Sequence, residues 1–431
     1  MPVAAIPAYL GQNFDSASPG LRFGMYLRIW GINRRTEELL WSKQDIYYAR
    51  RGQDKAEREL TDDNKSSALA DACKLTPSDQ ARLKAVIERQ ALLANSLPNL
   101  LSLQAIATAP FTTGLGNEHP LENGFAFLTP YGLPYLAGSG VKGVLRQAAR
   151  ELASGEWGDR HGWVNEKIHQ LERIDLSVLD VLFGAETGDG DSDHVRGVLS
   201  FWDVIPQLET NSLSVDVLTP HQTHYYQPKE AQKKGAGSPS PHDSGQPIPS
   251  YFLTLPPGTG FSFHVVCDLP RLERLAPDLA ENERWKTLLR AAFEHAFDWL
   301  GFGAKTAVGY GAMQHDHEAE ARAEAERSAQ LAAAAEAGRR QTLSAMQLQI
   351  DDFITAMQAR KALLMGRKDK PNTQCHQQAQ ALVKAAQGDD WSAEDRRAAA
   401  DAVEEWLPQV VAITAKDARK ALKLGALRGD G

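Results

Sequence analysis

Apolar and polar positions alternate along the first three quarters of the chain with the spacings of helices and strands. Apolar residues recur every three or four positions in three stretches, which predicts amphipathic helices at 76–94, 140–152 and 283–300. Shorter stretches have the composition of strands, and they lie at 21–32, 100–111, 195–204, 213–218, 251–255, 261–268 and just after 311. The Pro/Gly turn at 256–260 predicts that the two strands beside it pair as a hairpin.

The order of these elements predicts the fold class. Strand, helix, strands, helix, strand over 100–317 is typical of an α+β fold of the ferredoxin-like (RRM-like) kind, here with long insertions. Residues 1–99 add an N-terminal strand and a helical insertion to that body. From residue 318 the chain becomes rich in Ala, Glu and Arg, and a solvated helix precedes four further helices. We therefore expect a core at 100–317 and an α-helical C-terminal extension at 318–431.

Composition narrows the possible functions. With 42% hydrophobic residues in 431, the chain can form a full core, and its net charge of −8 excludes a general polyanion binder. A surface for nucleic acid must therefore be a local patch. Three scattered cysteines argue against a disulfide framework and indicate the cytoplasm. Neither a signal peptide nor a run of about 18 apolar residues is evident, so we expect no membrane partner.

A Gly/Ser turn precedes the helix predicted at 140–152. Ser139 is expected to be its N-cap, and a helix start gathers free N–H groups and positive charge, which suit a phosphate. Gly138 lies in the turn, and Lys142 and Arg146 share one helix face. These four residues are candidate phosphate contacts. The alternative is a capped surface helix whose cations are only solvated.

The same stretch matches a dinucleotide fingerprint only weakly. Gly138, Gly140 and Gly143 fit GxGxxG, but no buried strand precedes them, and the acids at Glu172 and Asp175 lie too far on. The phosphate loop GxxxxGK followed by Ser or Thr is absent from the sequence. We therefore expect no nucleotide cofactor, and no other cofactor is indicated.

A second glycine-rich stretch, GFGAKTAVGYGAM, follows the helix at 283–300. Gly301, Gly303, Gly309 and Gly311 leave the backbone bare, so that a phosphate or sugar can approach closely. Lys305 lies inside the loop and can neutralise a phosphate. The alternative is a helix stop followed by a tight turn.

Histidines invite a test for catalysis and for metal binding. His119 and His221 could serve as an acid–base pair for RNA cleavage, but they lie in different long loops, so we expect no catalytic residue. His221, His224 and Tyr225 open a polar insertion at 219–249, where their rings can stack on bases or serve the structure. The short histidine motifs supply two ligands each, whereas a closed zinc site needs four, so no metal is expected.

Three stretches together resemble the RAMP superfamily of CRISPR-associated proteins. They are GLGNEHPLENG with PYLAGSGVKGVLR, then VDVLTPHQTHYYQ, and finally GFGAKTAVGYG directly after a long helix. The likeness covers 100–313 well, 21–32 loosely and 318–431 not at all. Within the superfamily, the combination is most similar to a subunit of the Cmr complex, the type III-B RNA-targeting effector of antiviral defence.

The resemblance implies a function and a set of partners. Such a subunit has a ferredoxin-like body, caps the backbone of the ribonucleoprotein near the 3′ end of the guide (CRISPR) RNA, and contacts other Cmr subunits. Its insertion acts as a thumb beside the duplex of guide and target RNA, and target cutting is ascribed to another subunit.

On this interpretation the chain is a non-catalytic RNA-binding scaffold. Lys142 and Lys305 are expected to converge over one sheet edge. Two alternatives remain: a metal-independent endoribonuclease that processes guide precursors, and an adaptor that binds only proteins.

Overall fold

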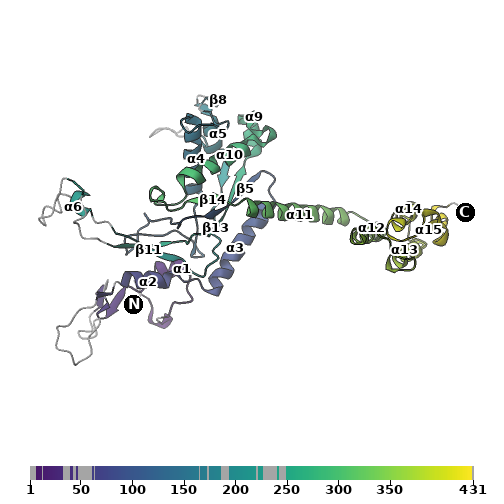
Figure 1. Cartoon of the computed structure of the whole chain (residues 1–431), viewed down its shortest axis with the longest axis horizontal. Helices are drawn as coiled ribbons and strands as arrows, with labels where there is room; N and C mark the ends of the chain where they lie inside the picture. The colour runs from purple at the N-terminus through teal and green to yellow at the C-terminus, as the bar shows by residue number, and fades with distance from the viewer. Residues whose placement is uncertain are drawn as a thin grey trace. The chain divides into compact units, whose positions relative to one another are not determined.

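The computed structural model of the chain (Figure 1) describes residues 6–11, 13–32, 39–41, 45–46, 61–62, 64–164, 166–171, 174–185, 194–219, 222–226, 240–241 and 249–429. Two compact units divide it, 1–325 and 326–431. The division falls inside a long helix, α11 (His317–Gln341), in which no residue is buried. Each unit has its own hydrophobic core.

A four-stranded antiparallel sheet forms the centre of the first unit, in the order β10-β13-β5-β14. The strands are β5 (Leu100–Ala107), β10 (Leu199–Phe201), β13 (Gly260–Cys267) and β14 (Met313–His315). Helix α4 (Gly138–Ser154) connects β5 to β10, and α10 (Arg284–His295) connects β13 to β14. Because both connections cross over a neighbouring strand, β10 and β14 become the two edges.

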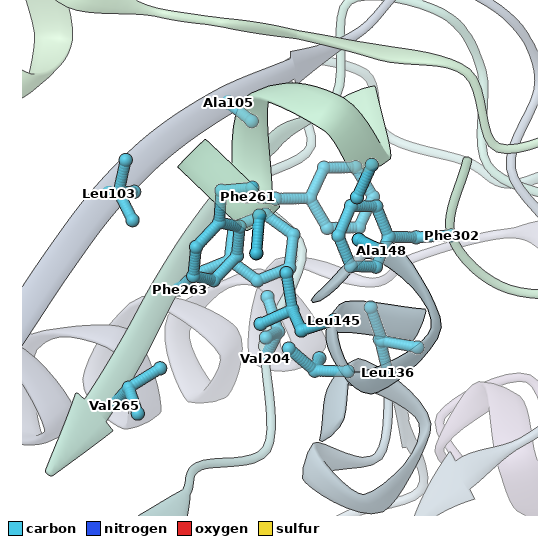
Figure 2. Close-up of a cluster of buried hydrophobic side chains, with 14 of the residues drawn as sticks. Leu103, Ala105, Leu136, Leu145, Ala148, Val204, Phe261, Phe263, Val265 and Phe302 are labelled. Atoms are coloured by element: carbon cyan, nitrogen blue, oxygen red, sulfur yellow. The ribbon is translucent and has the colours of Figure 1, made fainter. Parts of the chain in front are cut away.

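Aromatic side chains fill the space between this sheet and its helices (Figure 2). Phe263 of β13 lies 5.3 Å from Phe293 of α10 and 5.0 Å from Phe302, measured between ring centroids. Leu145 and Ala148 of α4 complete the cluster, and all five residues are buried. The two-residue period of the strand and the 3.6-residue period of the helix bring these faces together. Burying each large side chain contributes about 1.5–3 kcal/mol.

Local capping signals determine two of the predicted helices. The helix predicted at 76–94 is confirmed as α3 (Pro77–Asn95), where Thr76 and Asp79 form a reciprocal capping box. The helix predicted at 283–300 is confirmed as α10 followed by a π-helical turn, η3 (Ala296–Leu300). It ends at Gly301, whose φ of 68° suits glycine.

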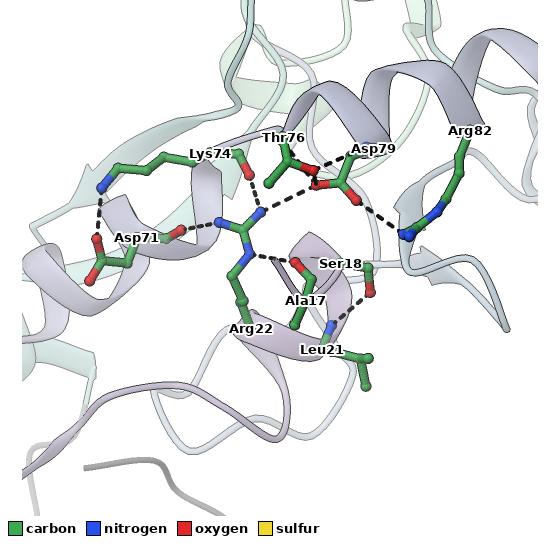
Figure 3. Close-up of polar contacts among 9 residues, drawn as sticks. All are labelled: Ala17, Ser18, Leu21, Arg22, Asp71, Lys74, Thr76, Asp79 and Arg82. Atoms are coloured by element: carbon green, nitrogen blue, oxygen red, sulfur yellow. Dashed lines mark hydrogen bonds and ion pairs between the residues drawn. The ribbon is translucent and has the colours of Figure 1, made fainter. Parts of the chain in front are cut away.

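One buried arginine joins three N-terminal helices, α1 (Pro19–Phe23), α2 (Asn64–Cys73) and α3 (Figure 3). Arg22 Nε donates to the carbonyl of Ala17 at 2.9 Å, and its Nη1 donates to that of Asp71 at 2.7 Å. Nη2 donates to the carbonyl of Lys74 and lies 3.6 Å from the carboxylate of Asp79. The guanidinium therefore fixes the end of α2 against the start of α3.

The described residues also form five two-stranded antiparallel sheets. They are β1 (Trp30–Ile32) with β2 (Leu39–Trp41), β3 (Asp45–Ile46) with β4 (Thr61–Asp62), β6 (Phe127–Leu128) with β7 (Leu133–Pro134), β8 (Lys167–Leu171) with β9 (Ile174–Ser177), and β11 (Ser214–Leu218) with β12 (Ser250–Thr254). Short helices complete the unit: η1 (Ala8–Leu10), α5 (Val178–Phe183), α6 (Thr223–Tyr226), α8 (Leu269–Leu275), α9 (Pro277–Ala280), η2 (Glu281–Glu283) and η4 (Thr306–Val308).

Two strand predictions are wrong. The stretch 21–32 begins inside α1, because Ser18 caps that helix and Pro19 occupies its first turn, and a strand starts only at Trp30. The hairpin predicted across 256–260 does not form, because β12 pairs with β11 whereas β13 pairs with β5 and β10. Phe111 bridges to Leu255 instead, which directs β12 away from the central sheet.

Helices dominate the second unit. They are the end of α11, then α12 (Ala345–Leu364), α13 (Gln374–Ala385), α14 (Ala393–Val410), α15 (Ala415–Ala421) and α16 (Leu424–Arg428). Met357, Ala379, Val403 and Leu407 are fully buried in its core. Across the described parts of both units, every helix is too short or too polar to cross a membrane.

Replacing Arg22 by Ala should lower the free energy of unfolding by about 3 kcal/mol, because it leaves three carbonyls without this donor and removes one of the two arginines that pair with the buried carboxylate of Asp79. Arg28→Ala is the matched control. Arg28 also pairs with an aspartate, Asp15 at 2.8 Å, but both side chains are exposed, so the loss should stay within about 1 kcal/mol. Urea unfolding followed by circular dichroism measures both. Equal losses would contradict the role assigned to Arg22.

Candidate nucleic-acid interface

The start of α4 differs from the prediction. Ala137 is the N-cap, with no side-chain bond, and Ser139 is an exposed residue of the first turn, so the N-cap predicted at Ser139 is wrong. The N–H of Gly138 donates to Asp203 Oδ1 at 2.8 Å. A Cβ at Gly138 would lie 2.3 Å from the carbonyl oxygen of Phe201, so only glycine lets the helix start this close to β10. A carboxylate of the chain itself therefore occupies part of the predicted phosphate site.

Lys142 and Arg146 lie in a group of cations that includes Arg196. The Arg146 side chain donates to the carbonyl of Gly184 at 3.0 Å, and Gly184 bridges to Arg196. Burial lowers the pKa of Lys142, and the positive charges of Arg146 and Arg196 lower this pKa further. We call these three residues the α4 cation group. An anion at this place would relieve the repulsion among them.

The glycine loop, residues 301–312, has two kinds of glycine. A Cβ would lie 2.3 Å from the carbonyl oxygen of Thr112 at Gly303 and 1.8 Å from that of Phe302 at Gly311. These two positions require glycine because of the packing of the chain on itself. Gly309, by contrast, is exposed and has open space around it, so its backbone is accessible to a ligand.

The same loop packs against the hairpin β11–β12. Lys305 Nζ lies 5.2 Å from the ring centroid of Phe252, and the Tyr310 hydroxyl donates to Asp216 Oδ2 at 2.6 Å. Burial and the bond to Asp216 raise the pKa of Tyr310 to about 12. The insertion at 219–249 connects the two strands of this hairpin, so Lys305 lies on the strands that carry the insertion.

Part of the insertion is described. His224 and Tyr225 belong to α6, and the rings of Tyr225 and Tyr226 lie 5.2 Å apart, edge to face. Tyr226 is 77% exposed and Tyr225 37%. His221 lies outside the described residues.

The sheet order assigns the two cationic regions to different edges. Arg196, in the α4 cation group, leads into β10, and the glycine loop with Lys305 leads into β14. The two central strands lie between, and three strand spacings amount to about 14 Å. The sheet order therefore does not support the expected meeting of Lys142 and Lys305 over one sheet edge.

His119 is held by the backbone on both sides of its ring. Nε2 donates to the carbonyl of Phe23 at 3.0 Å, and the N–H of Leu121 donates to Nδ1 at 3.2 Å. The ring stacks on Phe23 with a centroid distance of 3.8 Å. Burial lowers the pKa of His119, although the bond to Phe23 opposes this. Its contacts are those of a neutral structural histidine.

The sequence did not reveal Asp203, Arg196, Asp216 or Phe252. Each lies far along the chain from the residue it contacts, and only the sheet pairing brings the partners together. The glycine loop was visible because its signal is local.

About half of the chain is similar to a known family of proteins. Residues 105–314 match the family model of the RAMP superfamily, and the resemblance inferred from the motifs is confirmed. That segment includes the end of β5, all of α4 and the whole glycine loop.

One curated relative is a sixth subunit of the Cmr complex, which is also the subunit that the motifs most resemble. The chain is 28% identical to CRISPR system Cmr subunit Cmr6 of Pyrococcus furiosus over 261 residues, which cover 50% of this chain and 69% of the relative. The crystal structure of that Cmr6 matches 50% of this chain and 97% of its own, with 25% identity and a TM-score of 0.26. A Type III-B Cmr-beta complex bound to cognate target RNA matches 58% of this chain and 70% of its own, with 18% identity and a TM-score of 0.37.

Gly311→Ala should destabilise the chain more than Gly309→Ala. Both residues have positive φ, 69° and 94°, so each substitution costs about 1–2 kcal/mol of backbone strain. Only Gly311→Ala also forces a contact with Phe302, which adds about 1–3 kcal/mol. Thermal unfolding of the two variants gives the comparison. A larger loss for Gly309→Ala would show that the packing of the loop is misassigned.

The contribution of His119 should depend on pH. Its folded-state pKa is depressed, so its contribution is complete above the unfolded pKa of about 6.5 and is lost as the pH falls below that value. The stability difference between the wild type and His119→Gln should therefore be larger at pH 7.5 than at pH 5.5. Urea midpoints at the two pH values test this, and a constant difference would contradict it.

Proposed function

We propose that this chain is a non-catalytic scaffold subunit that binds guide RNA and caps the backbone of a type III-B CRISPR RNA-targeting effector near the guide 3′ end. Its partners are guide RNA, target RNA and the other Cmr subunits. The observation that carries the proposal is the glycine loop, in which Lys305 lies beside the accessible backbone of Gly309 on the hairpin that bears the insertion. This arrangement lies in the segment matched to the RAMP superfamily.

The fold that we propose for the core is ferredoxin-like. In chain order the strands of the central sheet are β5, β10, β13 and β14, with α4 after the first and α10 after the third. Their spatial order, second, third, first and fourth, is the one expected when two strand–helix–strand units interleave. On this proposal the insertions decorate that core, and the helices of the second unit form a C-terminal appendage.

Phosphate contacts explain how an acidic chain binds RNA. Contacts to the sugar–phosphate backbone do not depend on base sequence, so a local group of cations is enough. Lys305 with Gly309 is one such place. The α4 cation group is the second, because Lys142 is partly desolvated beside two arginines and gains from an anion more than an isolated surface lysine does.

The exposed tyrosines of α6 suit the thumb role. Tyr225 and Tyr226 present ring faces on the insertion, and stacking of a base on an aromatic ring is worth about 1–3 kcal/mol without sequence preference. We assign them contact with bases displaced at the duplex of guide and target RNA.

The contacts of His119 support a non-catalytic role, because a residue whose two ring nitrogens bond the backbone lacks a free site for proton transfer.

The state of the cysteines supports the proposed location in the cytoplasm. Cys73, Cys267 and Cys375 are free and buried, and burial raises the pKa of Cys73 and of Cys267 to about 12, which keeps both thiols protonated.

Lys305→Glu and Lys142→Glu should each weaken guide-RNA binding about tenfold and reduce the slope of log affinity against log salt by about 0.7. Because the two lysines belong to different groups of residues, their losses of binding free energy should add in the double variant. Lys84→Glu on α3 is the control, since Lys84 is an exposed lysine that faces only Glu88. Filter binding between about 50 and 200 mM salt, with and without the other Cmr subunits, measures the effect.

Two outcomes would contradict the proposal. One is a loss for Lys84→Glu that equals those of Lys142→Glu and Lys305→Glu. The other is cleavage of labelled repeat RNA by the pure protein in EDTA that disappears in His119→Ala or His221→Ala, since that result would identify a nuclease.

A further inference from the structure

Two exposed tryptophans wall a pocket at the end of α4. The pocket has a volume of about 310 Å³ and lies between the residues that follow α4 and the last turns of α10 and η3. Trp157 is 45% exposed and Trp299 66% exposed. Their ring centroids lie 5.3 Å apart, with an angle of 63° between the planes. Large apolar rings on a surface indicate contact with a ligand or a partner.

A buried polar pair holds one of these rings. His295 Nε2 lies 2.7 Å from Glu151 Oε2, and the side chain of His295 is only 6% exposed. The edge of Trp157 meets this imidazole at 5.0 Å with an interplanar angle of 89°. Because the base of the pocket is packed and hydrogen-bonded, its aromatic wall is ordered before any ligand arrives, which lowers the entropy cost of binding.

The rim of the pocket is acidic. Asp159, Glu294 and Asp298 line it, together with His161. Asp159 lies 3.7 Å from His161 and Glu294 lies 2.6 Å from His315, whereas the one arginine of the lining, Arg290, is paired with Glu320 at 2.7 Å. The carboxylates thus outnumber the cation, and the cation is already neutralised. The local potential favours a positively charged ligand.

Aromatic faces beside carboxylates are the features that bind an organic cation. A guanidinium can stack on a tryptophan ring while it donates to a carboxylate with two N–H groups, which an ammonium does less well. A nucleobase would also stack on tryptophan, but its phosphate would meet the three carboxylates of the rim. The volume suits a single side chain and is at the lower end of ligand pockets.

We propose that this pocket binds an arginine side chain of a partner protein. The pocket shares no lining residue with the α4 cation group or with the glycine loop, and the proposal does not depend on RNA binding. Trp157 and Trp299 supply the stacking faces, and Asp298 and Asp159 accept the N–H groups.

The test uses the full-length chain with ¹⁵N-labelled tryptophan and follows its indole N–H signals. Trp157→Phe and Trp299→Phe assign the two signals. The peptide Gly-Arg-Gly should shift both signals saturably, whereas Gly-citrulline-Gly, which has the same shape without the charge, should bind at least about tenfold more weakly. Raising the salt concentration should weaken only the arginine peptide.

Matched variants distinguish binding in the pocket from unspecific binding to the acidic surface. Asp298→Asn and Trp299→Ala should each weaken the arginine peptide several-fold, and Trp299→Phe should retain most of the affinity. Asp278→Asn, which changes an exposed carboxylate on α9, should have no effect. Tighter binding of adenosine monophosphate than of Gly-Arg-Gly would overturn the proposal, and so would unmoved indole signals at millimolar peptide.

Discussion

The pairing of β5 with β13 is the constraint on which the rest of the first unit depends. Gly260 lies opposite Ile106 and Val266 opposite Leu100, so this register covers nearly the full length of both strands. It turns Phe263 toward the helices, whereas a slip of one residue would turn this ring to the other face. The polar face specifies the same register, because Ser262 bonds Gln104 at 2.6 Å. Side chains on both faces of the sheet thus oppose a shift in register. β10 can then pair with β13, and β14 with β5, at defined positions.

Local signals predicted much of the fold, and long-range pairing caused the errors. The helix α3 was predictable because Thr76 and Asp79 close its first turn within four residues, and α10 because its apolar stripe ends at Gly301. The hairpin across 256–260 failed although its turn residues were suitable. Phe111, far away in sequence, bridges Leu255 and sends β12 to a different sheet. The residues of a turn predict that the chain reverses, but they do not predict with which strand each flanking segment pairs.

The candidate interface shows the same limit. The glycine loop could be found from sequence because the helix stop, the glycines and Lys305 form one short pattern. The sequence did not reveal why the glycines are there. Gly303 and Gly311 are required by the close carbonyls of Thr112 and Phe302, whereas Gly309 has open space where a Cβ would stand. At the start of α4, Ser139 was predicted to be the N-cap because serine is a good capping residue. In the structure Asp203, which follows β10, accepts the N–H of Gly138 at the start of the helix instead.

Along helix α4 this acidic chain has one positively charged surface and one negatively charged surface. Lys142 and Arg146 lie in its first half beside Arg196, whereas Glu151 lies near its end, below the tryptophan pocket. Each surface attracts one kind of charge and repels the other. A phosphate that suits the cations is disfavoured at the acidic rim, and an arginine that suits the rim is disfavoured at the cations. The net charge of −8 then reports only the sum. The two kinds of charge stay apart along one helix, because the start of α4 is held by Asp203 beside β10 and its end is held by His295 of α10.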